Sequence, residues 1–289
     1  MNDTPDNLAG IAIVGMAGRF PKARNLDEFW RNLCAGVEAI SFFSDAELAE
    51  VGVATTSTKA NFVKAQTVLE EADFFDAAFF GMNPREAELT DPQQRLFLEA
   101  AWEALEDANC DPNRFGEAIG VFAGMSTNTY LANNLAVTPQ LLIGINSEFQ
   151  AMVGNEHDYL TTRVSYKLNL RGPSLNIQTA CSTSLVAVCV ACQHLLTYQC
   201  NLALAGAVSV SFPQKRGYVY QQGGITSPDG HCRPFDVNSA GTVAGDGVGV
   251  VALKRLDDAV AAGDRIYGIV RGVGVSNDEI GRASCRERV

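Results

Sequence analysis

Short apolar runs alternate with amphipathic segments along the chain. The first run, Gly10–Met16, is rich in β-branched residues and closes at Gly15 and Gly18, which predicts a buried strand. A helix is predicted from about Asn25, because the apolar residues that follow recur at helical spacing. Strands that are apolar throughout and alternate with helices are typical of an α/β domain whose sheet is covered on both faces. Further strands are predicted at 119–123, 174–177, 202–210, 248–253 and 266–273, and further helices at 91–108, 157–168, 182–198 and 257–262.

The clearest helix start lies at Asp91. Asp91 can cap the helix, and Pro92 fits its first turn, where a missing N–H costs nothing. The side chain of Gln94 is expected to reach back to the cap. The helix then runs to about Ala108, behind an apolar stripe formed by Phe97, Ala100, Ala101, Ala104 and Leu105.

Composition narrows the class of protein. Of 289 residues 47% are hydrophobic, which excludes a disordered chain. With 33 acidic and 22 basic side chains the formal net charge is −11 and no basic cluster is present, so we exclude nucleic acid as the main partner. No apolar run reaches the roughly 18 residues of a membrane span, and the first ten residues lack the features of a signal peptide. We therefore expect a cytoplasmic protein whose eight cysteines are thiols.

One segment combines a nucleophile with a suitable backbone. Thr179–Ser184 lies between a predicted strand and a strongly apolar helix, which places Cys181 at a helix N-terminus. There the free N–H groups and the positive end of the helix dipole favour thiolate over thiol. Small neighbours leave room for an acyl group, and a backbone N–H at the turn can face a developing oxyanion. Position alone leaves open the alternative that Cys181 is a small buried side chain.

Five motifs carry a resemblance to a known family. In their order along the chain they are similar to the β-ketoacyl synthase (ketosynthase) domain of type I modular polyketide synthases, including those mixed with peptide synthetases. The resemblance extends from about Ile11 to Asp278. The motifs are the stretches at Asp91–Ala108 and Asn155–Gln178, TACSTSL at Thr179–Leu185, SPDGHCRPFD at Ser227–Asp236 and GDGVGVVALKRLDDA at Gly245–Ala259.

The resemblance implies a thiolase-like layered fold (αβαβα), of which this chain supplies the N-terminal half and the start of the C-terminal half. It also implies a decarboxylative Claisen condensation in polyketide or fatty-acid-type chain elongation. Cys181 would hold the acyl chain as a thioester and use its own backbone N–H as oxyanion donor, while a malonyl-type extender waits on an acyl carrier protein. Where the family commonly has Asp and Ser in this motif, the chain has Gln178 and Thr183; neither change touches the sulfur.

The same resemblance implies partners rather than cofactors. The domain itself would bind no cofactor and no metal, because its substrates arrive on the phosphopantetheine of an acyl carrier protein. The expected partners are that carrier, neighbouring synthase modules and a second copy in a homodimer. Lys215 and Arg216 are candidate basic contacts for the acidic carrier.

The family's two catalytic histidines and a second oxyanion N–H are missing from this sequence. Only His194 and His231 follow Cys181, and neither stands in a histidine motif of the family. His194 comes 13 residues after Cys181, roughly 20 Å along a helix, and His231 is interpreted as a loop residue. His157 is interpreted as a helix cap or a surface residue. We therefore predict that Cys181 can accept an acyl group but that this chain does not complete the condensation.

Other functions are weighed against this one. The main alternative is a non-catalytic fragment or pseudo-domain that acts only through subunit or carrier-protein contacts. A thiolase or another acyl-CoA condensing enzyme is disfavoured, because those relatives lack two of the motifs. A zinc site at Cys189, Cys192, His194 and Cys200 is disfavoured because all four lie on or just past one apolar helix.

The resemblance and the hydrophobic pattern together divide the chain into four segments. Residues 1–9 form a polar leader, 10–265 the ketosynthase N-terminal domain, and 266–278 the truncated start of its C-terminal domain. Residues 279–289 have no apolar periodicity and are interpreted as a vector-derived, non-native tail.

Overall fold

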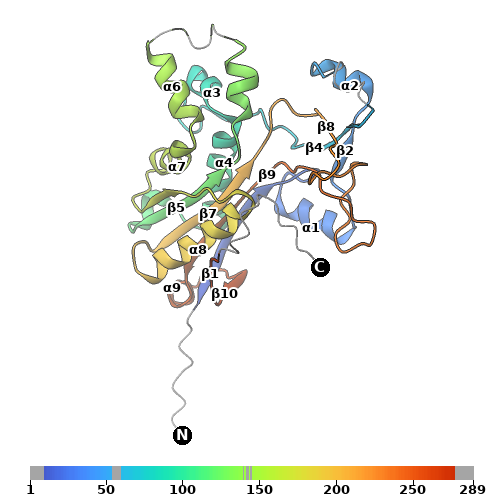
Figure 1. Cartoon of the computed structure of the whole chain (residues 1–289). Helices are drawn as coiled ribbons and strands as arrows, with labels where there is room; N and C mark the ends of the chain where they lie inside the picture. The colour runs from blue at the N-terminus through green and yellow to red at the C-terminus, as the bar shows by residue number, and fades with distance from the viewer. Residues whose placement is uncertain (1–9, 54–59, 139, 141–142, 144, 277–289) are drawn as a thin grey trace.

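A computed structural model describes residues 10–53, 60–138, 140, 143 and 145–276 (Figure 1). The expected leader at 1–9 and the expected tail at 279–289 lie outside the described residues. In the part of the chain that is described, no helix has the length and apolar character needed to cross a membrane.

A six-stranded mixed sheet forms the centre of the molecule, in the order β10-β1-β9-β7-β5-β6. β5, β6 and β7 run parallel to one another, whereas β9 is antiparallel to both β7 and β1, and β10 is antiparallel to β1. All six strands coincide with strands predicted from the sequence, so those predictions are confirmed. The strands are β1 (Ile11–Arg19), β5 (Ile119–Met125), β6 (Ser174–Asn176), β7 (Leu202–Ser209), β9 (Gly247–Arg255) and β10 (Gly268–Val270).

Helices cover both faces of this sheet (Figure 1). α4 (Pro92–Asp107) and α7 (Leu160–Lys167) pack on one face, and α8 (Thr183–Leu196) packs on the other. The alternation of side chains along β5 separates the two cores, because Val121 contributes to the α4 side and Phe122 to the α8 side. The described residues thus form three α/β/α layers, and α9 (Leu256–Ala262) packs beside β1 and β9.

Among the helices that pack on the central sheet, α4 has the largest fraction of buried residues. Ten of its 16 residues are buried, including the whole predicted apolar stripe. Asp91 caps the helix by accepting a hydrogen bond from the N–H of Gln93, which confirms the predicted cap. β1 approaches the backbone of α4 so closely that a Cβ at Gly15 would lie 2.7 Å from the nitrogen of Ala108. Glycine is therefore required at that position of the strand.

A smaller lobe lies beside the sheet, at the right of Figure 1. It pairs β2 with β4 and β3 with β8, and so joins residues 40–67 to residues 218–219. Ile40, Val63, Ala65 and Val243 form its apolar core. Its elements are α1 (Leu26–Cys34), β2 (Ile40–Phe42), α2 (Asp45–Glu50), β3 (Phe62–Val63), β4 (Ala65–Thr67) and β8 (Tyr218–Val219).

Shorter helices complete the described structure. The helix predicted at 157–168 is observed as a 3-10 turn, His157–Tyr159, that leads directly into α7. The others are α3 (Pro84–Leu89), α5 (Pro112–Phe115), a π-helix at Leu131–Leu135, α6 (Ile145–Asn155) and a 3-10 turn at Ala180–Ser182.

Candidate active site

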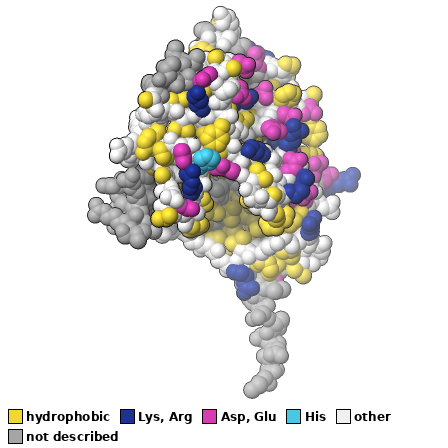
Figure 2. Space-filling view, turned by 90° about the vertical axis from the view of Figure 1, so that its right-hand side faces the viewer, with side chains coloured by type: hydrophobic (Ala, Val, Ile, Leu, Met, Phe, Trp, Pro, Cys, Tyr) yellow, Lys and Arg dark blue, Asp and Glu magenta, His cyan; other side chains and the backbone are white. Residues whose placement is uncertain are grey.

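A cavity of about 680 Å³ opens where β5 and β7 end and β9 begins. Residues 124–127 and 207–209 line it from the carboxyl ends of the two parallel strands, and 247–249 line it from the start of β9. In α/β sheets, ligands commonly bind at the carboxyl ends of parallel strands. The face seen in Figure 2 is hollowed, with hydrophobic side chains at the bottom of the hollow and charged side chains along its rim.

Cys181 lines this cavity and is exposed. It is the central residue of the 3-10 turn that precedes α8, and the residue before it, Ala180, has a positive φ of 53°. The N–H of Thr179 donates to Oγ1 of Thr183 at 3.0 Å, and the hydroxyl of Ser182 donates to the carbonyl of Thr179 at 2.8 Å. These bonds fix a tight turn that presents the thiol to the cavity. The alternative that Cys181 is a small buried side chain is therefore wrong.

The other cysteines of this region have a different environment. Cys189, Cys192 and Cys200 are buried, and burial raises the pKa of the Cys192 and Cys200 thiols to about 11. Cys192 and Cys200 pack in the core between α8 and the sheet, as small apolar side chains do. Within the described ranges, no group of three or more His, Cys, Asp or Glu side chains is arranged to hold a metal ion.

The three histidines lie in three different places. His157 lines the cavity together with Cys181, and its Nε2 lies 3.2 Å from the carbonyl oxygen of Ser126. The interpretation of His157 as a cap or surface residue is therefore corrected: it begins a 3-10 turn, but it is half-buried on the cavity wall. His194 bonds to the carbonyl of Val190 within α8 and does not line the cavity.

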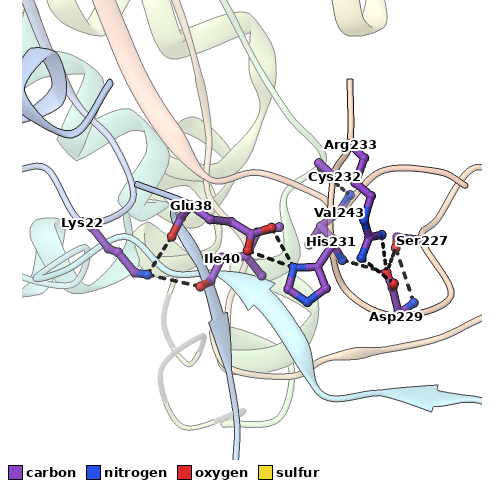
Figure 3. Close-up of polar contacts among 9 residues, drawn as sticks. All are labelled: Lys22, Glu38, Ile40, Ser227, Asp229, His231, Cys232, Arg233 and Val243. Atoms are coloured by element: carbon purple, nitrogen blue, oxygen red, sulfur yellow. Dashed lines mark hydrogen bonds and ion pairs between the residues drawn. The ribbon is translucent and has the colours of Figure 1, made fainter. Parts of the chain in front are cut away.

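His231 lies in a loop, as expected, and belongs to the SPDGHCRPFD motif (Figure 3). Its Nδ1 lies 2.9 Å from the carboxylate of Glu38, and Asp229 forms an ion pair with Arg233 at 2.9 Å. The sulfur of Cys232 accepts a hydrogen bond from the N–H of Val243 at 3.2 Å. The motif therefore ties the loop to the smaller lobe, and its residues do not line the cavity of Cys181.

The two residues that depart from the family pattern, Gln178 and Thr183, both line the cavity. Thr183 accepts the hydrogen bond that closes the turn around Cys181. Close backbone packing supports the same wall, because a Cβ at Gly124 would lie 2.5 Å from Cγ2 of Thr183 and would overlap the carbonyl oxygen of Ile177. The end of β5 can approach the nucleophile turn only as glycine.

A buried polar network beneath the cavity escaped the sequence reasoning. Gln93 is fully buried, and its Oε1 accepts from the hydroxyl of Ser126 at 2.7 Å and from the N–H of Val210 at 3.2 Å. Its Nε2 donates to Asp91, whose pKa burial raises to about 6, although the hydrogen bonds from Gln93 lower it in part. The only signal in the sequence is a pair of glutamines inside an otherwise apolar helical face.

The side chain of Gln94 does not cap α4 as predicted. Its side chain accepts from Nε of Arg163 at 2.7 Å and donates to the carbonyl of Glu156 at 3.1 Å. The predicted reach back to the helix cap is therefore wrong. The reason is burial: Gln94 is 1% exposed and faces α7, so its amide pairs with the buried Arg163.

A second buried carboxyl lies just before β9. Asp246 is 7% exposed, and its Oδ1 accepts from the N–H of Ser211 at 3.2 Å. Its Oδ2 is buried without a hydrogen-bond partner, and burial raises the pKa of this carboxyl to about 7. Asp246 is next to Gly247, which lines the cavity.

Comparison with known proteins places this geometry in a family. The family profile described as "Beta-ketoacyl synthase, N-terminal domain" matches residues 9–259. The chain is 48% identical over 280 residues to one of the phenolphthiocerol/phthiocerol polyketide synthase proteins of Mycobacterium tuberculosis, in a match that covers 95% of this chain and 19% of that protein. It is 37% identical over 297 residues to the polyketide synthase PksM of Bacillus subtilis, covering 98% of this chain and 7% of that protein.

Solved structures of ketosynthases also superimpose on this chain. Ketosynthase twelve from the bacillaene polyketide synthase of Bacillus amyloliquefaciens superimposes with a TM-score of 0.85 at 35% sequence identity, over 95% of this chain and 48% of that chain. The ketosynthase from module 1 of the bacillaene synthase of the same species gives a TM-score of 0.77 at 33% identity, over 97% and 48% of the two chains. The chain thus spans about half the length of these ketosynthases and a fifth or less of the curated synthases. It has the thiolase-like fold of ketosynthases, and it belongs to the β-ketoacyl synthase family as an N-terminal ketosynthase domain of the type I polyketide synthase kind.

Proposed function

We propose that Cys181 is the acyl-accepting nucleophile of a β-ketoacyl synthase that elongates a polyketide or fatty-acid-type chain. The observation that carries this proposal is the exposed thiol on a tight turn before α8, in the cavity at the strand ends. The small side chains and glycines of the cavity wall leave room for a thioester to approach the sulfur.

The chemistry proceeds in two parts. The thiolate of Cys181 attacks the carbonyl carbon of an acyl thioester, whose C–S bond then breaks and releases phosphopantetheine thiolate from an acyl carrier protein. A malonyl-type thioester on a carrier loses CO₂, and the resulting carbanion attacks the Cys181 thioester. That attack forms the C–C bond of a β-ketoacyl carrier thioester and returns Cys181 as thiolate. The backbone N–H of Cys181 donates to the oxyanion of the tetrahedral intermediate.

We infer that the residues of this chain complete only the first part. The second part needs general-base and electrostatic partners for decarboxylation. The chain has three histidines in all, and His157 is the one that lines the described cavity. We therefore expect acylation of Cys181 without detectable C–C bond formation, and detection of a β-ketoacyl product from this chain alone would overturn that expectation.

Partners follow from the same proposal. An acyl carrier protein would deliver the substrate, with Lys215 and Arg216 near the smaller lobe as candidate basic contacts, and other synthase modules would flank the domain. A homodimer is supported by β6, which pairs on one side with β5 and forms the edge of the sheet on its other side. Such an edge is suited to pairing with a second copy. The division between an N-terminal domain that ends at residue 265 and a second domain that begins at residue 266 stays a proposal. β10 follows this boundary and pairs with β1, so it belongs to the same sheet as the strands before the boundary.

Mass spectrometry of the intact protein tests the proposal. After incubation with butyryl-N-acetylcysteamine, we expect one butyryl adduct, located on Cys181 by peptide mapping and absent from Cys181→Ala. Cys232→Ala is the matched control, because Cys232 is also an exposed cysteine but lies outside the cavity. Equal labelling of Cys181→Ala and the unsubstituted chain would contradict the proposal. A folded chain with an inert Cys181 would favour the alternative, a non-catalytic domain that acts through protein contacts.

A further inference from the structure

The wall of the Cys181 cavity is almost free of charge. Among the described residues that line it, Cys181 and His157 are the two ionisable side chains. The rest are glycines, small hydroxyl side chains, Gln178 and apolar side chains such as Phe20 and Val248. A cavity of this composition suits a neutral acyl chain, and His157 is one of the polar side chains that can form a hydrogen bond to such a chain.

The hydrogen bond of His157 defines which ring nitrogen is available. A carbonyl oxygen can only accept, so the contact of 3.2 Å to Ser126 requires the proton on Nε2. In the neutral imidazole Nδ1 then carries a lone pair and can only accept. Within the described part of the chain, no hydrogen bond to Nδ1 is seen, and Nδ1 is not among the buried unsatisfied atoms.

Hydrogen bonds of a buried network hold the imidazole of His157 in position. The carbonyl of Ser126 also accepts from Nε2 of Gln93 at 3.4 Å, and the hydroxyl of Ser126 donates to Oε1 of the same glutamine. Gln93 is itself fully buried and held by Asp91. The imidazole therefore rests on a rigid buried network, as a recognition group requires.

We propose that His157 selects acyl chains that carry a hydrogen-bond donor, a hydroxyl or an amide N–H, which donates to Nδ1. This inference rests on the proposed function, because the chain it recognises is the one transferred to Cys181. An acyl chain without a donor leaves Nδ1 desolvated and unpaired, which disfavours its transfer. For one neutral hydrogen bond the expected preference is about tenfold in the rate of acylation.

Two isosteric pairs of N-acetylcysteamine thioesters test the proposal on the chain as it exists. The first pair compares 3-hydroxybutyryl with 3-methylbutyryl, in which a methyl replaces the hydroxyl, and the second compares N-acetylglycyl with 4-oxopentanoyl, in which a methylene replaces the amide N–H. The acylation rate of Cys181 is followed by intact mass. We expect the donor-bearing member of at least one pair to react about tenfold faster, and the pair that shows the preference identifies the donor as hydroxyl or amide.

Variants separate recognition from structure. His157→Leu should abolish the preference within each pair, and His157→Asn, which keeps an acceptor oxygen, should retain part of it. Equal rates within both pairs for the unsubstituted chain would overturn the inference, with no variant needed, and so would an undiminished preference in a folded His157→Leu. If the unsubstituted chain reacts with none of the four thioesters, the proposed function fails and the inference fails with it.

Discussion

Gln93 holds both the hydroxyl and the carbonyl of Ser126, a residue 33 positions away: its Oε1 accepts from the hydroxyl at 2.7 Å and its Nε2 donates to the carbonyl at 3.4 Å. The N–H of Val210 donates to the same Oε1 at 3.2 Å. Ser126 and Val210 directly follow β5 and β7, so one buried amide on α4 joins the ends of the two strands that form the cavity.

Replacement of this amide should loosen the cavity wall. Gln93→Leu leaves the hydroxyl of Ser126 and the N–H of Val210 without their partner, and each buried unsatisfied group costs about 1–3 kcal/mol. We expect the free energy of unfolding to fall by roughly 2–4 kcal/mol in urea titrations. Glu106→Gln, an exposed change on the same helix, should stay within about 0.5 kcal/mol. A Gln93→Leu protein as stable as the unsubstituted chain would show that the hydrogen bonds of Gln93 contribute nothing to the free energy of unfolding.

The turn that carries Cys181 can pack against the end of β5 only because Gly124 has no side chain. A Cβ at Gly124 would overlap the carbonyl oxygen of Ile177 and lie 2.5 Å from Cγ2 of Thr183, so Gly124→Ala must push β5 and the Cys181 turn apart. Forced overpacking of this kind costs about 1–3 kcal/mol, and we expect slower acylation of Cys181 as well. Gly245→Ala is the control, because its Cβ would meet no atom within 4 Å. Thermal unfolding and acylation rates compare the two, and equal behaviour would contradict the expectation.

Arg163 is buried in a polar site that spans α3, α4, α6 and α7. It donates to Gln94 at 2.7 Å, to Glu86 at 3.4 Å and to the carbonyl of Val153 at 3.2 Å. Arg163→Met leaves the buried Oε1 of Gln94 without its donor, whereas Glu86 keeps its ion pair with Lys167 at 3.3 Å, so we expect a loss of roughly 1–3 kcal/mol in stability. Arg114→Met, at a guanidinium that is 89% exposed beside Asp111, should change stability by less than about 1 kcal/mol. Urea unfolding compares the two variants. Similar unfolding midpoints would show that the buried contacts of Arg163 contribute no more to stability than the exposed contact of Arg114.

The sequence predicted the sheet well because the central strands β5 and β7 are buried on both faces over most of their length, which produces long apolar runs. It also placed Cys181 correctly, since a strand, a small-residue turn and an apolar helix follow one another without interruption. It could not place Gln93 or His157, because their partners Ser126 and Val210 are distant along the chain and come together only when β5 and β7 align. The capping role of Gln94 was wrong for the same reason: local rules describe an exposed helix end, whereas this one is buried against Arg163.

Asp246 should make stability depend on pH. Burial raises the pKa of its carboxyl from an ordinary value near 3.8 to about 7, so the folded state binds the proton more tightly than the unfolded state. The stabilisation is fully present below about pH 4 and is lost as the pH rises through about 7. At about 1.4 kcal/mol per pKa unit, the loss amounts to roughly 2–4 kcal/mol.

Asp246→Asn removes this titration while its Oδ1 can still accept from the N–H of Ser211. We expect the variant to match the unsubstituted chain near pH 4 and to be more stable at pH 8, because no charge is then buried. Thermal unfolding midpoints between pH 4 and pH 8 measure the difference, with Asp27→Asn, at an exposed position of α1, as a control that follows the unsubstituted chain. Parallel curves for Asp246→Asn and the unsubstituted chain would mean that Asp246 titrates alike in the folded and unfolded states.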